Sequence, residues 1–366
     1  MSAPRLAVLL AALATLVIAA PPTTAVAQTR AASPAAAAKQ WAPPRTPWGH
    51  PDRQGTYTNK DESGIPMEKP DNVSAKAPDD VEDSEFADIV RERNKQTAAR
   101  APQAGGITGA GPTHWYENYD AKNSRLWLVV DPSGKIPPET EDAKKRAAAR
   151  AAERARSGRG EADSWTDRSL YDRCISLSVP GSMTPKIYGN SYEIVQSPDA
   201  VVIRYEMIHE ARIIPLDPST LGEPQGRPEP GRGTTGSGSP RAEPRGDGRT
   251  HMSPAIRAYM GYARGHFDGN TLVVETTNFH PAVNNRGATE SLRLIERFTP
   301  VAPNKIEWSV TYDDARTWTR PWTWAMLLTK DESQAIFEYG CHEGNYGLRN
   351  ILSAARAEEK AAQSRK

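Results

Sequence analysis

The chain has 366 residues, with 46 Lys and Arg against 45 Asp and Glu, and a formal net charge of +1. A charge this close to zero argues against nucleic acid, and against an anionic membrane surface, as the main partner. The length allows one large domain or two small ones, and long low-complexity stretches favour one core with appendages.

Residues 1–27 form a predicted secretory signal peptide. Arg5 precedes the apolar run LAVLLAALATLVIAA, and Ala25-Val26-Ala27 is a small-residue cleavage site. The alternative is an uncleaved membrane anchor, but the run is shorter than the roughly 20 residues that a spanning helix needs. We expect a secreted or periplasmic protein with no transmembrane segment after cleavage.

The mature chain divides by composition. Residues 28–47 are rich in Ala and Pro and read as a flexible leader. A single β-rich domain is expected over 48–357, interrupted at 217–250 by an insertion of Pro, Gly, Arg, Ser and Glu that is expected to be disordered. Residues 358–366 are a charged tail that is expected to fray.

The second half of the chain consists of strand-sized runs with turn signals between them. In chain order we expect a short strand within 46–59, a strand at 125–131, a solvated peripheral helix at 139–156, strands at 192–196, 201–216, 266–279, 290–301, 305–314, 319–330 and 334–343, and a C-terminal helix from 346. Such spacing predicts a mainly β fold, an antiparallel barrel or sandwich with peripheral helices.

The chain has two cysteines, Cys174 and Cys341. In an exported protein this pair favours a disulfide, because thiols outside the cytoplasm are not kept reduced. The alternative is two buried free thiols. A bridge would bring two polar segments together and create a second candidate binding site. Its residues are Tyr171, Asp172, Arg173, His342, Glu343 and Tyr346. The alternative is a polar rim around the disulfide.

Alternation along the strands predicts which side chains point inward. The odd positions of 201–213 are mostly apolar, and they carry Tyr205 and His209 to the core face. The same argument places Glu296 and Arg320 among aromatic and aliphatic neighbours. A buried charge is costly unless it is paired, so either Glu296 and Arg320 form a structural ion pair, or these groups line a ligand cavity.

The cavity alternative implies acid–base catalysis. Arg320 would hold an anion, His209 or Tyr205 would move a proton, and Glu296 would complete the catalytic set of a lyase or isomerase. Aromatic side chains suited to stacking on a sugar or a flat molecule come from Trp308, Tyr312 and Trp322. A ligand carrier without turnover would have the same residues.

Other chemistries lack a motif. The seven histidines form no HExxH or HxH pair, and the chain has no P-loop, dinucleotide fingerprint or G-x-S-x-G elbow, so we expect neither a metal nor a cofactor. Zinc held by His209, His266 and His280 is an alternative that their spacing does not support.

The motifs SLYDRC, YGNSYEIVQ, IRYEMIHEARIIPLD, GHFDGNTLVVETTNF, TWTRPWTW and FEYGCHEGNYGLRNIL resemble a large group of secreted bacterial proteins of unknown function. The resemblance covers roughly 165–357 together with the segment WAPPRTPWGHPDRQGTYTN. It implies export from a bacterium, with no mechanism. A weaker likeness to lipocalin-type barrels rests on Gly55, Tyr57 and the hairpin series.

Together these features predict an exported β-barrel protein that binds a small organic or sugar ligand in an aromatic-lined cavity. Lyase-like or isomerase-like chemistry on that ligand is part of the hypothesis. The alternative is a structural or envelope-interaction protein that has no ligand cavity.

Overall fold

The computed structural model describes residues 41–71, eight residues between 82 and 95, 125–186, 188–217, and 252–365 without 254, 334 and 344. The predicted signal peptide, most of the leader and nearly all of the insertion therefore lie outside the described residues. Within them, no helix is long and apolar enough to cross a membrane.

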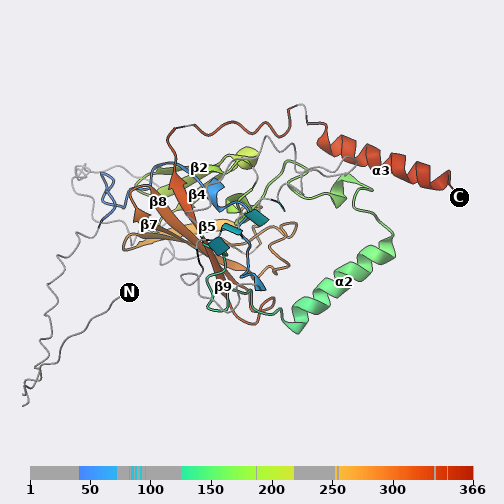
Figure 1. Ribbon diagram of the computed structural model, residues 1–366, viewed down its shortest axis with the longest axis horizontal. Helices are drawn as coiled ribbons and strands as arrows, with labels where there is room; N and C mark the ends of the chain where they lie inside the picture. The colour runs from blue at the N-terminus through green and yellow to red at the C-terminus, as the bar shows by residue number, and fades with distance from the viewer. Residues whose placement is uncertain are drawn as a thin grey trace, which may run out of the picture. The chain divides into compact units, whose positions relative to one another are not determined.

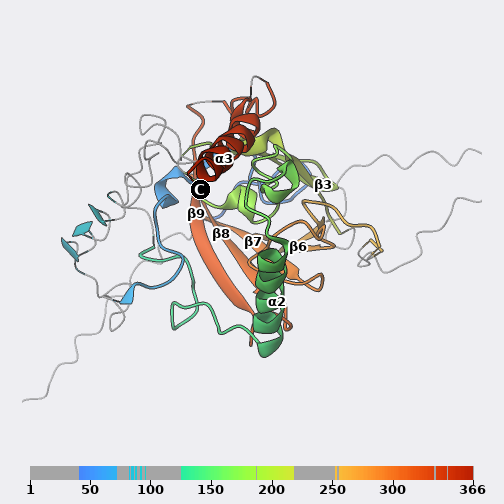
Figure 2. The ribbon, with the colours of Figure 1, turned by 90° about the vertical axis from the view of Figure 1, so that its right-hand side faces the viewer.

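Nine antiparallel strands form one sheet, in the spatial order β4-β3-β2-β1-β9-β8-β7-β6-β5. Figures 1 and 2 show how the long strands within residues 293–330 curve together. The strands are β1 (Gly55–Thr58), β2 (Ser191–Gln196), β3 (Ala200–Tyr205), β4 (Ala211–Pro215), β5 (Tyr262–Asp268), β6 (Thr271–Thr277), β7 (Arg293–Ala302), β8 (Lys305–Asp313) and β9 (Trp322–Lys330).

The sheet curls into a nearly closed barrel, which confirms the mainly β prediction and selects the barrel over the sandwich. An odd number of alternating strands leaves the two outermost strands, β4 and β5, running the same way. They meet through a parallel bridge between Leu216 and Gly265, and the amide of Asp217 donates to the carbonyl of Gly265 at 2.8 Å. A Cβ at Gly265 would lie 2.9 Å from Cγ2 of Ile214, so glycine permits this close approach.

The strand expected over 201–216 is in fact two strands. A 3-10 turn, η8 (Met207–His209), separates β3 from β4, and Ile208 adopts a left-handed φ of 65°. The turn shifts the alternation by one position. After it the even residues face the core, so Arg212 is 3% exposed whereas Ile213 is 65% exposed.

Two other expected strands are irregular. The described residues of 334–343 have no ladder partner, and segment 125–131 contributes only an isolated bridge between Val129 and Trp324.

The predicted peripheral helix and the predicted C-terminal helix are confirmed. Helix α2 spans Glu141–Ser157 and begins at Thr140, whose side chain accepts from the amide of Ala143. Helix α3 spans Gly347–Gln363.

Large side chains fill the barrel. Its fully buried set includes Tyr192, Tyr205, Phe298, Trp308, Trp322 and Trp324. At the end with the β5–β6 hairpin, the buried Arg53 donates to the carbonyls of Pro51, Asn270 and Phe298. At the other end, the ring of Tyr312 stacks on that of Trp322 with a centroid separation of 4.5 Å. The interior is therefore a packed core.

An ion pair crosses this core. Nη2 of Arg212, on β4, donates to Oε2 of Glu296 on β7 at 2.6 Å and to Oγ1 of Thr276 on β6 at 2.6 Å. The indole Nε1 of Trp308 donates to the other carboxylate oxygen of Glu296 at 3.2 Å. Because β4 lies at one edge of the sheet and β6 and β7 lie near the other, the pair ties the barrel shut from within.

Arg212→Met should destabilise the protein by about 3–5 kcal/mol, because it leaves the Glu296 carboxylate buried without a counter-charge. The double variant Arg212→Met/Glu296→Leu should lose less than the single one. Urea unfolding followed by tryptophan fluorescence measures both.

Arg204→Met is the matched control, since Arg204 pairs with Glu193 on the outside of the same sheet with side chains 47% and 38% exposed. It should cost less than about 1 kcal/mol. A loss of that small size for Arg212→Met would contradict the role assigned to the buried pair.

Candidate functional site

The predicted interior residues divide into those that share the core and those that do not. Glu296, Trp308, Tyr312 and Trp322 lie inside the barrel, with exposures from 0% to 3%, as the alternation predicted. Tyr205 lies there too. Burial raises the pKa of Tyr205 to about 12, and the neighbouring Arg212 guanidinium opposes that rise.

Arg320 does not join them, so the predicted Glu296–Arg320 pair is wrong. Arg320 lies in the turn before β9, where strand alternation does not apply, and its side chain is 49% exposed. It pairs with Asp131 and, by its hydrogen bond, holds the pKa of that carboxyl well below its usual range. Arg212 takes the place expected for Arg320.

His209 belongs to the turn η8, and the alternation of β3 ends at Tyr205, so the strand pattern that placed His209 in the core does not reach it.

The pKa of Arg212 reflects its interaction with its buried neighbours. Burial is the largest single effect and lowers this pKa, but the Glu296 carboxylate and Tyr205 together outweigh burial and raise it above the usual value.

The predicted disulfide is confirmed, with a Cα–Cα distance of 5.7 Å between Cys174 and Cys341. A formed disulfide is typical of proteins outside the reducing cytoplasm. Beside it, the hydroxyls of Tyr171 and Tyr339 are 3.1 Å apart, and the Asn345 amide donates to the carbonyl of Cys341 at 2.7 Å.

The second predicted site is only loosely assembled around this bridge. Arg173 lies over the ring of Trp165 at 4.7 Å, whereas His342, Glu343 and Tyr346 are exposed. Within the described part of the chain, groups of three or more His, Cys, Asp or Glu that could hold a metal ion do not occur.

Three clefts lie around α2, and of the residues of the two predicted sites only Asp172 lines one of them. The first has a volume of about 930 Å³ and lies between α2 and the loop 281–288 that follows β6. We call it the arginine groove. Its polar and charged lining residues are Glu139, Arg150, Arg154, Arg159, Asn284 and Arg286.

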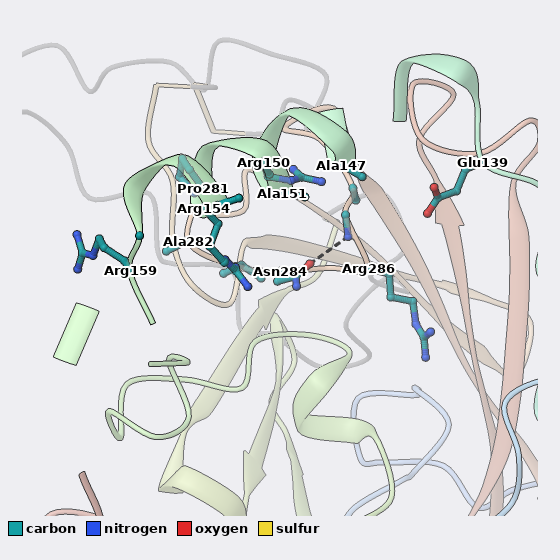
Figure 3. A pocket seen from close by; sticks show the side chains of 15 residues that line it. Glu139, Ala147, Arg150, Ala151, Arg154, Arg159, Pro281, Ala282, Asn284 and Arg286 are labelled. Carbon is teal, nitrogen blue, oxygen red and sulfur yellow. Dashed lines mark hydrogen bonds between the residues drawn. The ribbon is translucent and has the colours of Figure 1, made fainter. Parts of the chain in front are cut away.

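Figure 3 shows how these side chains are arranged. Arg154 points from α2 toward the loop that carries Asn284, whereas Arg286 points away from the helix. Arg150 also reaches the loop. Its Nη2 lies 3.6 Å from the position that a Cβ atom on Gly287 would occupy. Arg286 is turned toward the barrel, and its guanidinium carbon lies 5.8 Å from the ring centroid of Trp322. Arg150 and Arg154 are therefore the cations available to an occupant of the groove.

Both walls of the arginine groove are fixed to one corner of the barrel, the turn after β8. On the helix side, Oγ1 of Thr140 donates to the carbonyl of Arg316 at 2.6 Å, and Nη2 of Arg146 donates to Oγ1 of Thr317 at 3.1 Å. On the loop side, the buried Asp314 accepts from the amide of Thr289 at 2.6 Å. The groove is thus built before any ligand arrives.

The charge at the centre of the arginine groove is only partly compensated. Neither Arg150 nor Arg154 forms an ion pair within 4 Å among the described residues, although Asp167 pairs with Arg159 at 2.8 Å, and the pKa of Asp167 is lowered first by that pairing and also by the charge of Arg154. Arginine presents a planar fork of N–H donors that matches carboxylate, sulfate and phosphate groups. The arrangement can bind an organic anion.

The sequence contained one signal for this site. Arg146, Arg150 and Arg154 recur every four residues, which places them on one face of a helix. The lack of a broad apolar face correctly predicted a solvated helix, but nothing in the pattern shows that a loop more than 120 residues later lies opposite it.

Comparison with protein-family models, with curated proteins and with solved structures finds no match for this chain. The site is therefore interpreted from its own geometry.

A further buried acid lies outside the three clefts and has no part in the ion pair of the core. Glu62, in the 3-10 turn η1 (Lys60–Glu62), is 1% exposed. Burial raises its pKa from 4.5 to about 8, against the opposing effects of the Leu327 amide and the nearby Arg125. The folded protein therefore holds a proton that the unfolded chain releases at lower pH.

From this shift we predict that the contribution of Glu62 to stability is fully present below about pH 4.5 and is lost as pH rises through about 8. Glu62→Gln removes the titrating group, so the variant should gain stability relative to wild type as pH rises across this range. Unfolding free energies measured at pH 5, 7 and 9 test this. The exposed Glu343→Gln should track wild type, and a Glu62→Gln difference that does not change with pH would contradict the assignment.

Proposed function

We propose that this protein is exported and binds an organic anion in the arginine groove, on the outside of its barrel. The observation that carries the proposal is the pair of guanidiniums on Arg150 and Arg154. They line a preformed cleft, and neither forms a close ion pair among the described residues. The signal-like N-terminus and the disulfide support an extracytoplasmic setting.

The location differs from the one that the sequence predicted. The aromatic side chains expected to stack on a ligand pack against one another, with Trp308 and Trp324 edge to face at 4.9 Å. Acid–base chemistry needed Arg320 beside Glu296 as the anion holder, and Arg320 lies on the outside. We therefore propose binding, and turnover is no part of the proposal.

Isothermal titration with citrate at low ionic strength tests the proposal. Each guanidinium that makes a charge-assisted hydrogen bond contributes about 1.5–3 kcal/mol, so Arg150→Gln and Arg154→Gln should each weaken binding about tenfold or more. Raising the salt concentration should weaken wild-type binding as well.

Arg156→Gln is the control. Arg156 lies on the same helix, is 73% exposed and lines none of the three clefts, so its removal should leave the affinity within about twofold. Equal losses for Arg156→Gln and Arg154→Gln would show that citrate senses only the net charge of the helix, and the proposal would fail. So would the absence of measurable binding to the wild-type protein.

A further inference from the structure

We infer that the anion is a small carboxylate with an apolar body. Its carboxylate binds Arg150, and its body lies in the cleft of about 390 Å³ that adjoins the arginine groove, which we call the adjoining cleft. This rests on the proposed function and names its ligand class. The features that carry it are the shared position of Arg150, the apolar lining of the adjoining cleft and a buried amide donor beside it.

Arg150 lies at the boundary of two clefts. The adjoining cleft shares Arg150, Pro281, Val283 and Ala288 with the arginine groove. A ligand whose carboxylate binds Arg150 can therefore place the rest of its structure on either side, and the lining of each cleft decides which side is favoured.

The adjoining cleft has the most apolar lining of the three. Phe279 and Leu292 belong to the hydrophobic core of the barrel and line this cleft and neither of the others. Val283 and Ala288 are half-buried, so they still present apolar surface. A hydrocarbon body that covers such side chains removes apolar surface from water, which stabilises a complex.

The cleft of about 710 Å³ at the other end of the helix is a poorer place for an anion. It is lined by as many carboxylates as guanidiniums, and its acidic residues are Glu153, Glu161, Asp167 and Asp172. The lining of the adjoining cleft includes one acid, Glu290, which pairs with Arg316 at 3.0 Å. Charge therefore directs the ligand toward the apolar side of Arg150.

Two further arginines line the adjoining cleft. Arg146 is already held by Asp142 and by Oγ1 of Thr317, so it is not available to a ligand. Arg257 donates to the carbonyl of Phe279 at 3.3 Å and, among the described residues, forms no ion pair within 4 Å. The available cations are thus Arg150 and Arg257, which suits one carboxylate and not a polyanion.

A buried amide adds a donor. The side chain of Asn285 lines the adjoining cleft, is 8% exposed, and in the described part of the chain its Nδ2 has no hydrogen-bond partner. A buried donor without an acceptor is costly. A carboxylate oxygen in this cleft would supply the acceptor, whereas a pure hydrocarbon would not.

NMR titrations of the full-length mature protein, followed by the backbone amides of residues 279–292, test the inference with three compounds. The affinity for 3-phenylpropionate should exceed that for acetate, which keeps the charge and lacks the ring, by about tenfold or more. It should also exceed that for 3-phenylpropanol, which keeps the ring and lacks the charge, by about tenfold or more.

Variants locate the two parts of the ligand. Val283→Asn makes the apolar wall polar, so the advantage of 3-phenylpropionate over acetate should fall by about threefold or more. Arg150→Gln should weaken the binding of both carboxylates, and the control Arg156→Gln should weaken neither. Urea unfolding shows whether Val283→Asn is folded, and the comparison of the three compounds on the wild-type protein needs no variant.

Several results would overturn the inference. Equal affinities for 3-phenylpropionate and acetate would exclude the apolar body, and the proposed function would stand if citrate still bound. Equal affinities for the acid and the alcohol would show that the cleft binds apolar molecules regardless of charge. A folded Val283→Asn variant that keeps the full preference would place the ring outside this cleft. If neither citrate nor 3-phenylpropionate bound, both proposals would fail.

Discussion

The ion pair between Arg212 and Glu296 is the constraint on which the rest of the structure depends. Backbone hydrogen bonds join eight neighbouring pairs of strands but leave β4 and β5 in contact only at one end. Arg212 crosses that gap inside the barrel and reaches both β6 and β7. Two charges removed from water are stabilised there by each other and by one further hydrogen bond each, from Nη2 of Arg212 to Thr276 and from Trp308 to Glu296, whereas Nε and Nη1 of Arg212 are buried without a hydrogen-bond partner. The pair therefore fixes which strands face each other and makes the interior a closed core.

Because the core is closed, the proposed binding site lies outside the barrel. A nine-stranded barrel is slightly wider than one of eight strands, whose interior ordinary side chains just fill. This protein fills the space with tryptophan and tyrosine, and Arg53 and the Tyr312–Trp322 stack occupy the two ends. The same aromatic residues that suggested a ligand cavity are thus the packing material of the barrel. The open space of the molecule lies instead between its helix and a loop.

The sequence predicted what depends on local pattern. Alternation over β7, β8 and β9 placed Glu296, Trp308 and Trp322 inside, and two cysteines in an exported chain predicted the bridge. The prediction of which side chains face the core was wrong where a short turn interrupts a strand. The turn at Ile208 reversed the alternation and concealed Arg212, and the turn before β9 placed Arg320 outside. The arginine groove could not be predicted, because it requires knowing that the turn after β8 holds both α2 and the loop 281–288.

The central claim is that ligands bind outside the barrel while its core remains unchanged. The most direct test is an NMR titration with citrate. It follows the indole N–H resonances of Trp308 and Trp324 together with the backbone amides of α2 and the loop 281–288. The account predicts that the amides shift and saturate while both indole resonances stay in place, because these rings lie in the packed interior. Shifts of the two indole resonances that saturate with the ligand, without changes along α2, would contradict it and return the binding site to the barrel.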